Sequence, residues 1–144
     1  MTLLVDTSVW SLALRRDGDA REPEVQALKD ALFGDDVVVT TGLVLQELLQ
    51  GFSGPKAQQA QIVERFAALP LIQPDRDDHV AAAGIRNTCR RGGVQLGTID
   101  ALIARLCIRH ELTLLTTDKD FVHAARHCPL TLWPAKVRVR KRDA

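Results

Sequence analysis

The chain has 144 residues, of which 46% are hydrophobic and 26% are charged, and its formal net charge is +1 at pH 7. This composition is typical of one globular domain with a sizeable core and excludes the low-complexity and disordered classes. No apolar run approaches the roughly 18 residues that a membrane span needs, and we expect no signal peptide. The three cysteines lack the C-x-x-C spacing of a zinc site, so we expect buried thiols in a reducing compartment.

The charge is unevenly distributed along the chain. Residues 135–144 carry a charge of +4, which leaves −3 for the rest. The body is therefore not a uniformly basic platform for nucleic acid. If it binds RNA or DNA, a bound metal ion, the tail or scattered arginines must offset its acidic groups. The tail itself is equally consistent with a solubilising end and with a role in binding nucleic acid.

Short apolar runs alternate with amphipathic segments. In chain order, we predict a strand over 3–5, a helix over 7–14, a polar loop over 15–22, a helix over 23–33, a strand over 37–40, helices over 42–50 and 56–69, a very short strand over 71–72, helices over 75–91 and 98–110, a strand over 112–116, a helix over 119–127 and a last strand over 130–133. Strands that alternate with helices predict an α/β fold, a three-layer sandwich with a small, mostly parallel sheet flanked by helices. We expect one domain over 1–134 and a basic tail over 135–144.

Two carboxylates follow apolar runs that are typical of buried parallel strands. Asp6 comes directly after Leu3–Val5, and Asp118 follows the run that begins at Leu112. Ligand sites in parallel α/β sheets lie at the carboxyl ends of the strands, so both side chains are expected to open onto one crevice. The alternative for each is a structural helix N-cap, which Asp fills readily.

Two further carboxylates lie at the edges of apolar helix stripes. Glu47 lies on the shoulder of the stripe that contains Leu48, and no oppositely charged residue is four positions away. Asp100 lies at the edge of a similar stripe, in the first turn of its helix, where the helix dipole alone would favour it. Asp120 is an additional candidate ligand or a first-turn helix acid. Four acids in these positions together are difficult to explain as caps and surface charge.

Small hydroxyl residues flank the acids. Thr7, Ser8, Thr98 and Thr117 could orient a carboxylate or a water molecule, and capping explains them equally well. We expect Thr98 to cap its helix. Acidic clusters of this kind commonly hold Mg²⁺ or Mn²⁺ against a phosphodiester. Without the metal ion, mutual repulsion should raise the pKa of one carboxyl.

The ordered set of motifs resembles the PIN-domain proteins, and in particular the VapC toxins of bacterial toxin–antitoxin pairs. The matching segments begin with Leu4–Trp10, continue with Glu47 and 100–104, and end with Leu115–Phe121. The resemblance extends over essentially the whole chain, although the segment after Trp133 matches no motif of the family.

The resemblance implies a Mg²⁺- or Mn²⁺-dependent endoribonuclease that is cytoplasmic, homodimeric and inhibited by a cognate antitoxin, with tRNA or rRNA as its substrate. The acidic cluster would consist of Asp6, Glu47, Asp100 and Asp118, with Asp120 matching a less uniform position. Hydrolysis by water would leave a 5′-phosphate and a 3′-hydroxyl. Direct metal contact is expected for Asp6, Asp100 and Asp118, and Glu47 would bind the metal or orient the attacking water.

Several alternatives remain open at this point. A haloacid-dehalogenase phosphatase would need an acid where Ser8 stands, and a phosphate-receiver domain would need a late strand-end lysine. His79, His110, His123 and His127 could serve a metal-free ribonuclease, or the last two could bind a transition metal one helical turn apart. A catalytically inactive PIN fold could act as a protein-binding module. The apolar first helix, with Trp10 and Leu14, is either a dimer or antitoxin surface or simply part of the core.

Overall fold

A parallel sheet of four short strands organises the protein. The strands are β1 (Thr2–Val5), β2 (Val37–Val39), β3 (Thr113–Leu115) and β4 (Thr131–Leu132), and they lie in the order β2–β1–β3–β4 with every pair parallel. The computed structural model describes residues 1–15 and 22–134. Most of the predicted loop over 15–22 and all of the basic tail over 135–144 lie outside the described residues.

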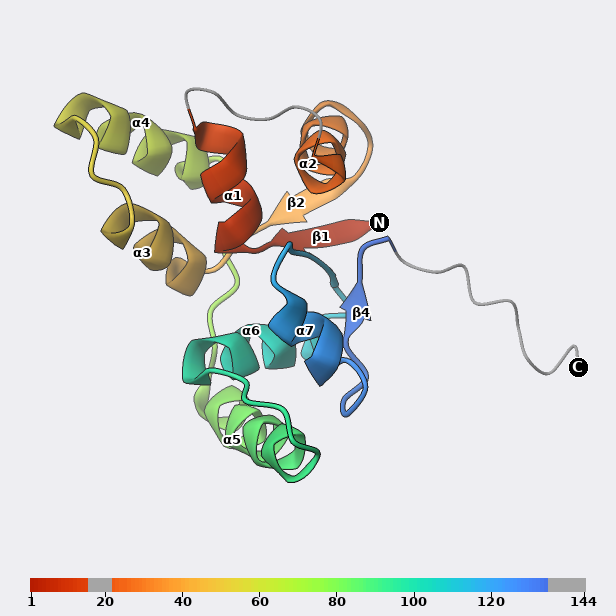
Figure 1. The fold of residues 1–144 in the computed structure, drawn as a ribbon. Coiled ribbons are helices and arrows are strands. Elements are labelled where there is room, and N and C mark those ends of the chain that lie inside the picture. Colours follow the sequence, from red (N-terminus) through yellow and green to blue (C-terminus); the bar gives the residue numbers. More distant parts are fainter. Residues whose placement is uncertain (16–21, 135–144) are drawn as a thin grey trace, which may run out of the picture.

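Helices flank the sheet on both sides. They are α1 (Thr7–Leu14), α2 (Pro23–Phe33), α3 (Gly42–Gln50), α4 (Lys56–Ala67), α5 (Arg76–Arg91), α6 (Thr98–Arg109) and α7 (Lys119–Ala124). In Figure 1, α1 and α2 lie above β1, whereas α5, α6 and α7 lie below it. The predicted three-layer α/β sandwich is confirmed, and the sheet in the described residues is entirely parallel.

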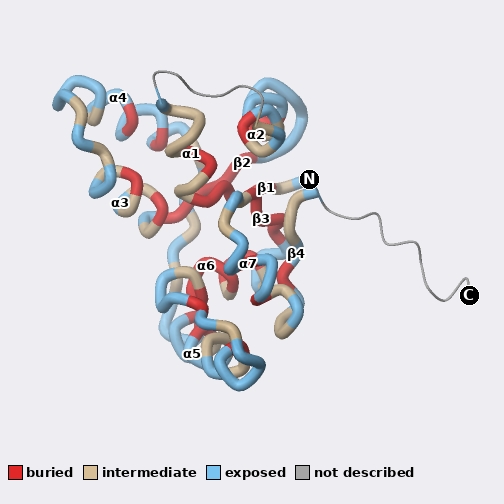
Figure 2. The backbone as a smooth tube through the Cα atoms, viewed as in Figure 1, coloured by how far each residue is buried: buried red, intermediate tan, exposed pale blue. Residues whose placement is uncertain are grey.

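The central strands are buried because helices cover both of their faces. Leu4 and Val5 of β1 and Leu114 and Leu115 of β3 are fully buried, and Figure 2 shows this buried layer between the two groups of helices. Continuous apolar runs rather than alternating ones are what a parallel sheet covered on both sides requires. The carboxyl ends of β1 and β3 are adjacent, since Val5 pairs with Leu115.

The first helix contributes to this core. Val9 is fully buried and Trp10 is 7% exposed, and the Trp10 ring lies 4.8 Å from that of Phe66 on α4. The interpretation of these two residues as a free partner surface is therefore wrong in this structure. They cover the sheet and join α1 to α4, while Leu14 remains half-buried beside them.

Three predicted element ends differ from the structure. The segment over 71–72 forms only an isolated bridge, between Leu71 and Thr40. Helix α7 ends at Ala124 and not at 127, because the chain continues in tighter turns in which the His127 N–H donates to the Ala124 carbonyl. Helix α6 has Gly97 and not Thr98 at its N-cap, with no side-chain cap.

The α5–α6 hairpin is held by a buried carboxylate. Asp78, whose side chain is fully buried, and Asp75 form a reciprocal capping box at the start of α5. Asp78 also accepts from Arg105 at 3.0 Å and from Arg109 at 2.6 Å, both near the end of α6. Burial alone would raise the pKa of Asp78, but the Asp75 N–H and the two guanidinium groups outweigh it and lower the pKa to about 2.

Candidate active site

Asp6 lies where β1 gives way to α1, and its side chain does not cap the helix. It occupies the N-cap position with an extended backbone, but makes no side-chain cap hydrogen bond. Its Oδ2 instead accepts from Ser8 Oγ and from Thr116 Oγ1, each at 2.8 Å. The carboxylate is only 6% exposed. The alternative interpretation of Asp6 as a structural N-cap is therefore wrong.

The direction of these hydrogen bonds is fixed by the backbone of the β3–α7 turn. Ser8 Oγ accepts from the Thr117 N–H at 3.1 Å, and Thr116 Oγ1 accepts from the Asp118 N–H at 3.0 Å. A hydroxyl group has one proton to donate, and both donate it to Asp6. Two hydroxyl donors on one oxygen favour the ionised carboxylate, so the Asp6 side chain is held in place as an acceptor.

Glu47 on α3 faces the same turn from the other side of β1. Thr7 Oγ1 donates to Glu47 Oε1 at 3.4 Å, which is a long hydrogen bond. Burial and the nearby charge of Asp6 raise the pKa of Glu47, whereas the hydrogen bond from Thr7 lowers it in part. The shoulder position on the α3 stripe therefore directs Glu47 toward the strand ends rather than into solvent.

Asp100, in the first turn of α6, is the point at which the acidic side chains converge. Burial raises its pKa to about 7, with further contributions, in decreasing order, from the charges of Asp6, Asp118, Glu47 and Asp120. All five predicted acids are thus close enough to interact. The expected rise in the pKa of one carboxyl is observed, and it falls on Asp100. Beside it, Gly97 leaves open the space next to Asp100 Oδ2.

Asp118 has two roles. Its Oδ1 caps α7 by accepting from the Asp120 N–H at 2.9 Å, as the capping interpretation predicted. Its charge also acts on Asp100. Asp120 is exposed and lies at the edge of the cluster.

The residue that sequence reasoning missed is Thr116. Its hydroxyl links Asp6 to the β3–α7 turn. Thr117, which was considered, contributes only its backbone N–H, and Thr98 lines a separate cleft between α5 and α6. The signal in the sequence was the alternation after a buried strand, which directs the side chain of Thr116 toward the neighbouring strand end.

The donors of this cluster suit a hard divalent cation. They are all carboxylate and hydroxyl oxygens, the ligands that Mg²⁺ and Mn²⁺ prefer. Among residues 1–15 and 22–134, no three acidic, histidine or cysteine side chains already converge as a ready-made ligand set. Repulsion between like charges keeps such side chains apart in the absence of a cation, and the raised pKa of Asp100 reports the same repulsion. The residues therefore fit a metal ion electrostatically, and binding would require small rotamer changes.

The histidine alternative has a different outcome. His123 lies in the last turn of α7, but His127 lies beyond the end of the helix and packs against Gly92 in the loop after α5. The one-turn spacing that a metal-binding pair would require is lost. The fold and the site thus define a class of α/β proteins in which carboxylates from β1, α3, α6 and α7 meet at the carboxyl edge of a parallel sheet.

Comparisons with known proteins identify this class. A family model described as the PIN domain matches residues 3–127. The chain is 32% identical over 127 residues to ribonuclease VapC11 of Mycobacterium tuberculosis, which covers 86% of this chain and 92% of that protein. The chain therefore belongs to the PIN-domain family and, within it, to the VapC ribonucleases, so that the resemblance found in the sequence is confirmed.

Solved structures agree on the fold. VapBC2 of Rickettsia felis, bound to a DNA fragment from its promoter, superposes with a TM-score of 0.70 at 23% identity, covering 92% of this chain and 97% of that one. VapC20 of Mycobacterium tuberculosis, described as a sarcin-ricin loop cleaving toxin, superposes with a TM-score of 0.66 at 24% identity, covering 90% and 98%. No helix in the described part of the chain is long and apolar enough to cross a membrane.

Proposed function

We propose that the protein is an endoribonuclease that depends on Mg²⁺ or Mn²⁺ and is the toxin of a type II toxin–antitoxin pair. The observation that carries the proposal is the convergence of carboxylates on Asp100, whose pKa is raised to about 7 by burial and by its acidic neighbours. A chain that retains this repulsive cluster has kept a feature that destabilises the fold, which is typical of a functional site. The kinship with VapC ribonucleases gives the cluster its substrate class, RNA.

The acidic side chains have distinct roles in the proposal. Asp6, Asp100 and Asp118 would hold the cation, Glu47 would bind it or orient the attacking water, and Asp120 would be an outer ligand. When bound, the cation would supply Lewis-acid activation of water and neutralise charge on the phosphate. Ser8 and Thr116 would hold Asp6 as an anion with a fixed orientation. Glu47, whose pKa is raised, is suited to accept a proton from water at the same edge.

The partners follow from the same kinship. Structural relatives are toxin–antitoxin complexes, such as VapBC2 of Rickettsia felis, and this supports a cognate antitoxin as inhibitor. An apolar cavity of about 310 Å³ between α1, α2 and α4, lined by residues such as Trp10, Leu14 and Leu32, is a suitable place for an antitoxin segment. We also infer a homodimer, a cytoplasmic location, and tRNA or rRNA as the substrate.

The direct test is RNA cleavage by the purified chain after removal of any co-purified partner. Total RNA would be incubated with Mg²⁺ or Mn²⁺, with EDTA, and with the Asp100→Asn variant. Discrete fragments that disappear with EDTA and with the variant are expected, and sequencing of their ends would identify the target. Cleavage that survives EDTA would contradict the metal mechanism. Absence of both cleavage and Mn²⁺ binding would favour the alternative function, an inactive PIN-fold protein-binding module.

A further inference from the structure

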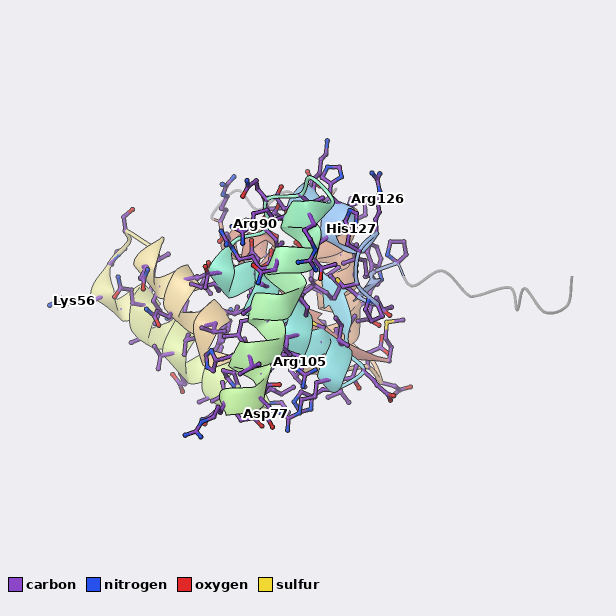
Figure 3. All side chains as sticks on the ribbon, turned by 90° about the horizontal axis from the view of Figure 1, so that it is seen from below. Lys56, Asp77, Arg90, Arg105, Arg126 and His127 are labelled. Atoms are coloured by element: carbon purple, nitrogen blue, oxygen red, sulfur yellow. The ribbon has the colours of Figure 1, made fainter. Side chains whose placement is uncertain are left out.

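The charges of helix α5 are segregated toward its two ends. Asp75, Asp77 and Asp78 lie at its start, and the segment 79–99 contains three arginines and no acidic residue. Figure 3 shows this polarity, with Asp77 at one end of α5 and Arg90 at the other. The body of the protein is acidic in total, so a local basic surface of this kind is not a consequence of net charge.

The turn after α7 adds to the basic end of α5. The imidazole of His127 lies directly against the backbone of Gly92, so closely that a Cβ at position 92 would overlap the ring. This contact brings Arg126 to the same end of the molecule as Arg90, as Figure 3 shows. Gly92 is thus the glycine that allows two segments far apart in sequence to meet. We name the surface of Arg90, Arg91 and Arg126 the basic rim.

The arginines of the basic rim are exposed and held on the surface. Arg90 donates to Asn87 Oδ1 at 2.7 Å, and Arg91 donates to Thr88 Oγ1 at 3.2 Å. No ion pair connects the three arginines of the rim to a carboxylate within residues 1–15 and 22–134, whereas Arg105 and Arg109 both bind Asp78. The guanidinium groups of the rim therefore keep donors for another anion.

The basic rim is joined to the acidic cluster by a short loop. Arg91 is six residues from Gly97, so the two cannot be more than about 20 Å apart. Gly97 in turn lies beside Asp100 Oδ2. The other side of the rim is connected in the same way, because α7 has only six residues and begins directly after Asp118. One extended polyanion can therefore lie on the rim and reach the cluster.

We propose that the basic rim binds the sugar–phosphate backbone of single-stranded RNA and positions it for the acidic cluster. The inference rests on the proposed function and adds the surface that the substrate follows. Its physical reason is complementary charge, because phosphates that approach an acidic cluster need cationic groups beside it. Backbone contacts of this kind fix position without reading sequence. Arg90, Arg91 and Arg126 are thus positioning residues and not catalytic ones.

The test measures binding without cleavage. The full chain with Asp100→Asn would be titrated in Mg²⁺, by fluorescence anisotropy, against a fluorescein-labelled single-stranded RNA of about 20 nucleotides. Replacement of the three rim arginines by Gln is expected to raise Kd about tenfold or more. It should also reduce the slope of log K against log salt by about 2, since each lost phosphate contact on a single strand contributes about 0.7.

The matched control removes the same charge elsewhere. Lys29, Lys56 and Arg76 are exposed and lie outside the rim, and their replacement by Gln should change Kd less than twofold. Lysine in place of the rim arginines should restore most of the binding, which separates loss of charge from loss of fold. Equal weakening in the rim and control variants would overturn the inference, as would an unchanged salt slope in the rim variant.

The two proposals can fail separately. If the native chain cuts no RNA but binding still depends on the rim, only the proposed ribonuclease activity fails. If the native chain cuts RNA and the rim variant binds and cuts equally well, only the present inference fails, and an acidic protein partner would become the better occupant of the rim.

Discussion

The repulsion at Asp100 predicts that an inactivating substitution stabilises the metal-free protein. The pKa of Asp100 is about 7 in the folded chain and 3.8 in its model state, a difference of about three units. The folded carboxyl keeps its proton to a higher pH than the unfolded one, so the stability of the protein falls as pH rises from about 4 to about 7. Asp100→Asn removes the charge and therefore this loss.

The magnitude is limited by solvent. Three units correspond to about 4 kcal/mol, but Asp100 is only partly buried, so screening reduces the value to about 1–2 kcal/mol. A first-turn Asp also gains about 0.3–1 kcal/mol from the helix dipole, which the variant loses. We expect Asp100→Asn to stabilise the metal-free chain by about 1 kcal/mol at pH 8, a rise in Tm of about 2–4 °C, and to give no gain at pH 5.

The assay is urea unfolding in EDTA at pH 5, 6, 7 and 8, followed by circular dichroism. Asp77→Asn is the matched control, because Asp77 is also a first-turn acid but lies on α5, outside the cluster. Its effect should be the same at every pH. If the free energies of unfolding of Asp100→Asn and the parent differ by the same amount from pH 5 to pH 8, the repulsion inferred at Asp100 does not exist.

Three further predictions concern the cation, the hydroxyl groups and the buried ion pair. Mn²⁺ should raise the Tm of the parent chain but not of Asp100→Asn, as differential scanning fluorimetry would show, and equal shifts would place the ion elsewhere. Ser8→Ala combined with Thr116→Val should reduce Mn²⁺ affinity and RNA cleavage about 10- to 100-fold with little loss of fold, measured by calorimetry and gel assay; unchanged affinity would refute the orienting role. Asp78→Asn should lower the free energy of unfolding at pH 7 by about 2–4 kcal/mol, because two guanidinium groups lose their partner. Since the pKa of Asp78 is about 2, that loss should persist down to about pH 4 and disappear only toward pH 2, and a loss that disappears by pH 5 would contradict it.

The sequence predicted the sheet and most helix bounds because burial dominates them. Helices α1, α2 and α3 have the predicted residues, since apolar periodicity, Pro23 and Gly51 are strong local signals. The errors lie where tertiary contacts decide the ends. The last turn after α7 tightens where His127 meets Gly92, and no local signal reveals that contact.

The site was predictable as a set of residue types and not as a network. Strand ends and stripe shoulders placed the five acids at one edge, but they could not show which carboxyl would carry the raised pKa. That outcome depends on Thr116 and Ser8, which both direct their protons to Asp6. Because Asp6 is held as an anion, the repulsion falls on Asp100, which lies nearest to the other charges and has no comparable donors among the described residues.

Helix α6 therefore combines two opposed electrostatic environments. At its N-terminus Asp100 is destabilised by burial and by like charges, and the fold gains nothing there until a cation binds. At its C-terminal end Arg105 and Arg109 bind the buried Asp78, which connects α6 firmly to α5. The ion pair is formed above about pH 2 and so is complete at the pH at which Asp100 ionises. The repulsion at one end of the helix can persist because the other end is fixed, and this fixed position is what keeps the Asp100 carboxylate within reach of Asp6.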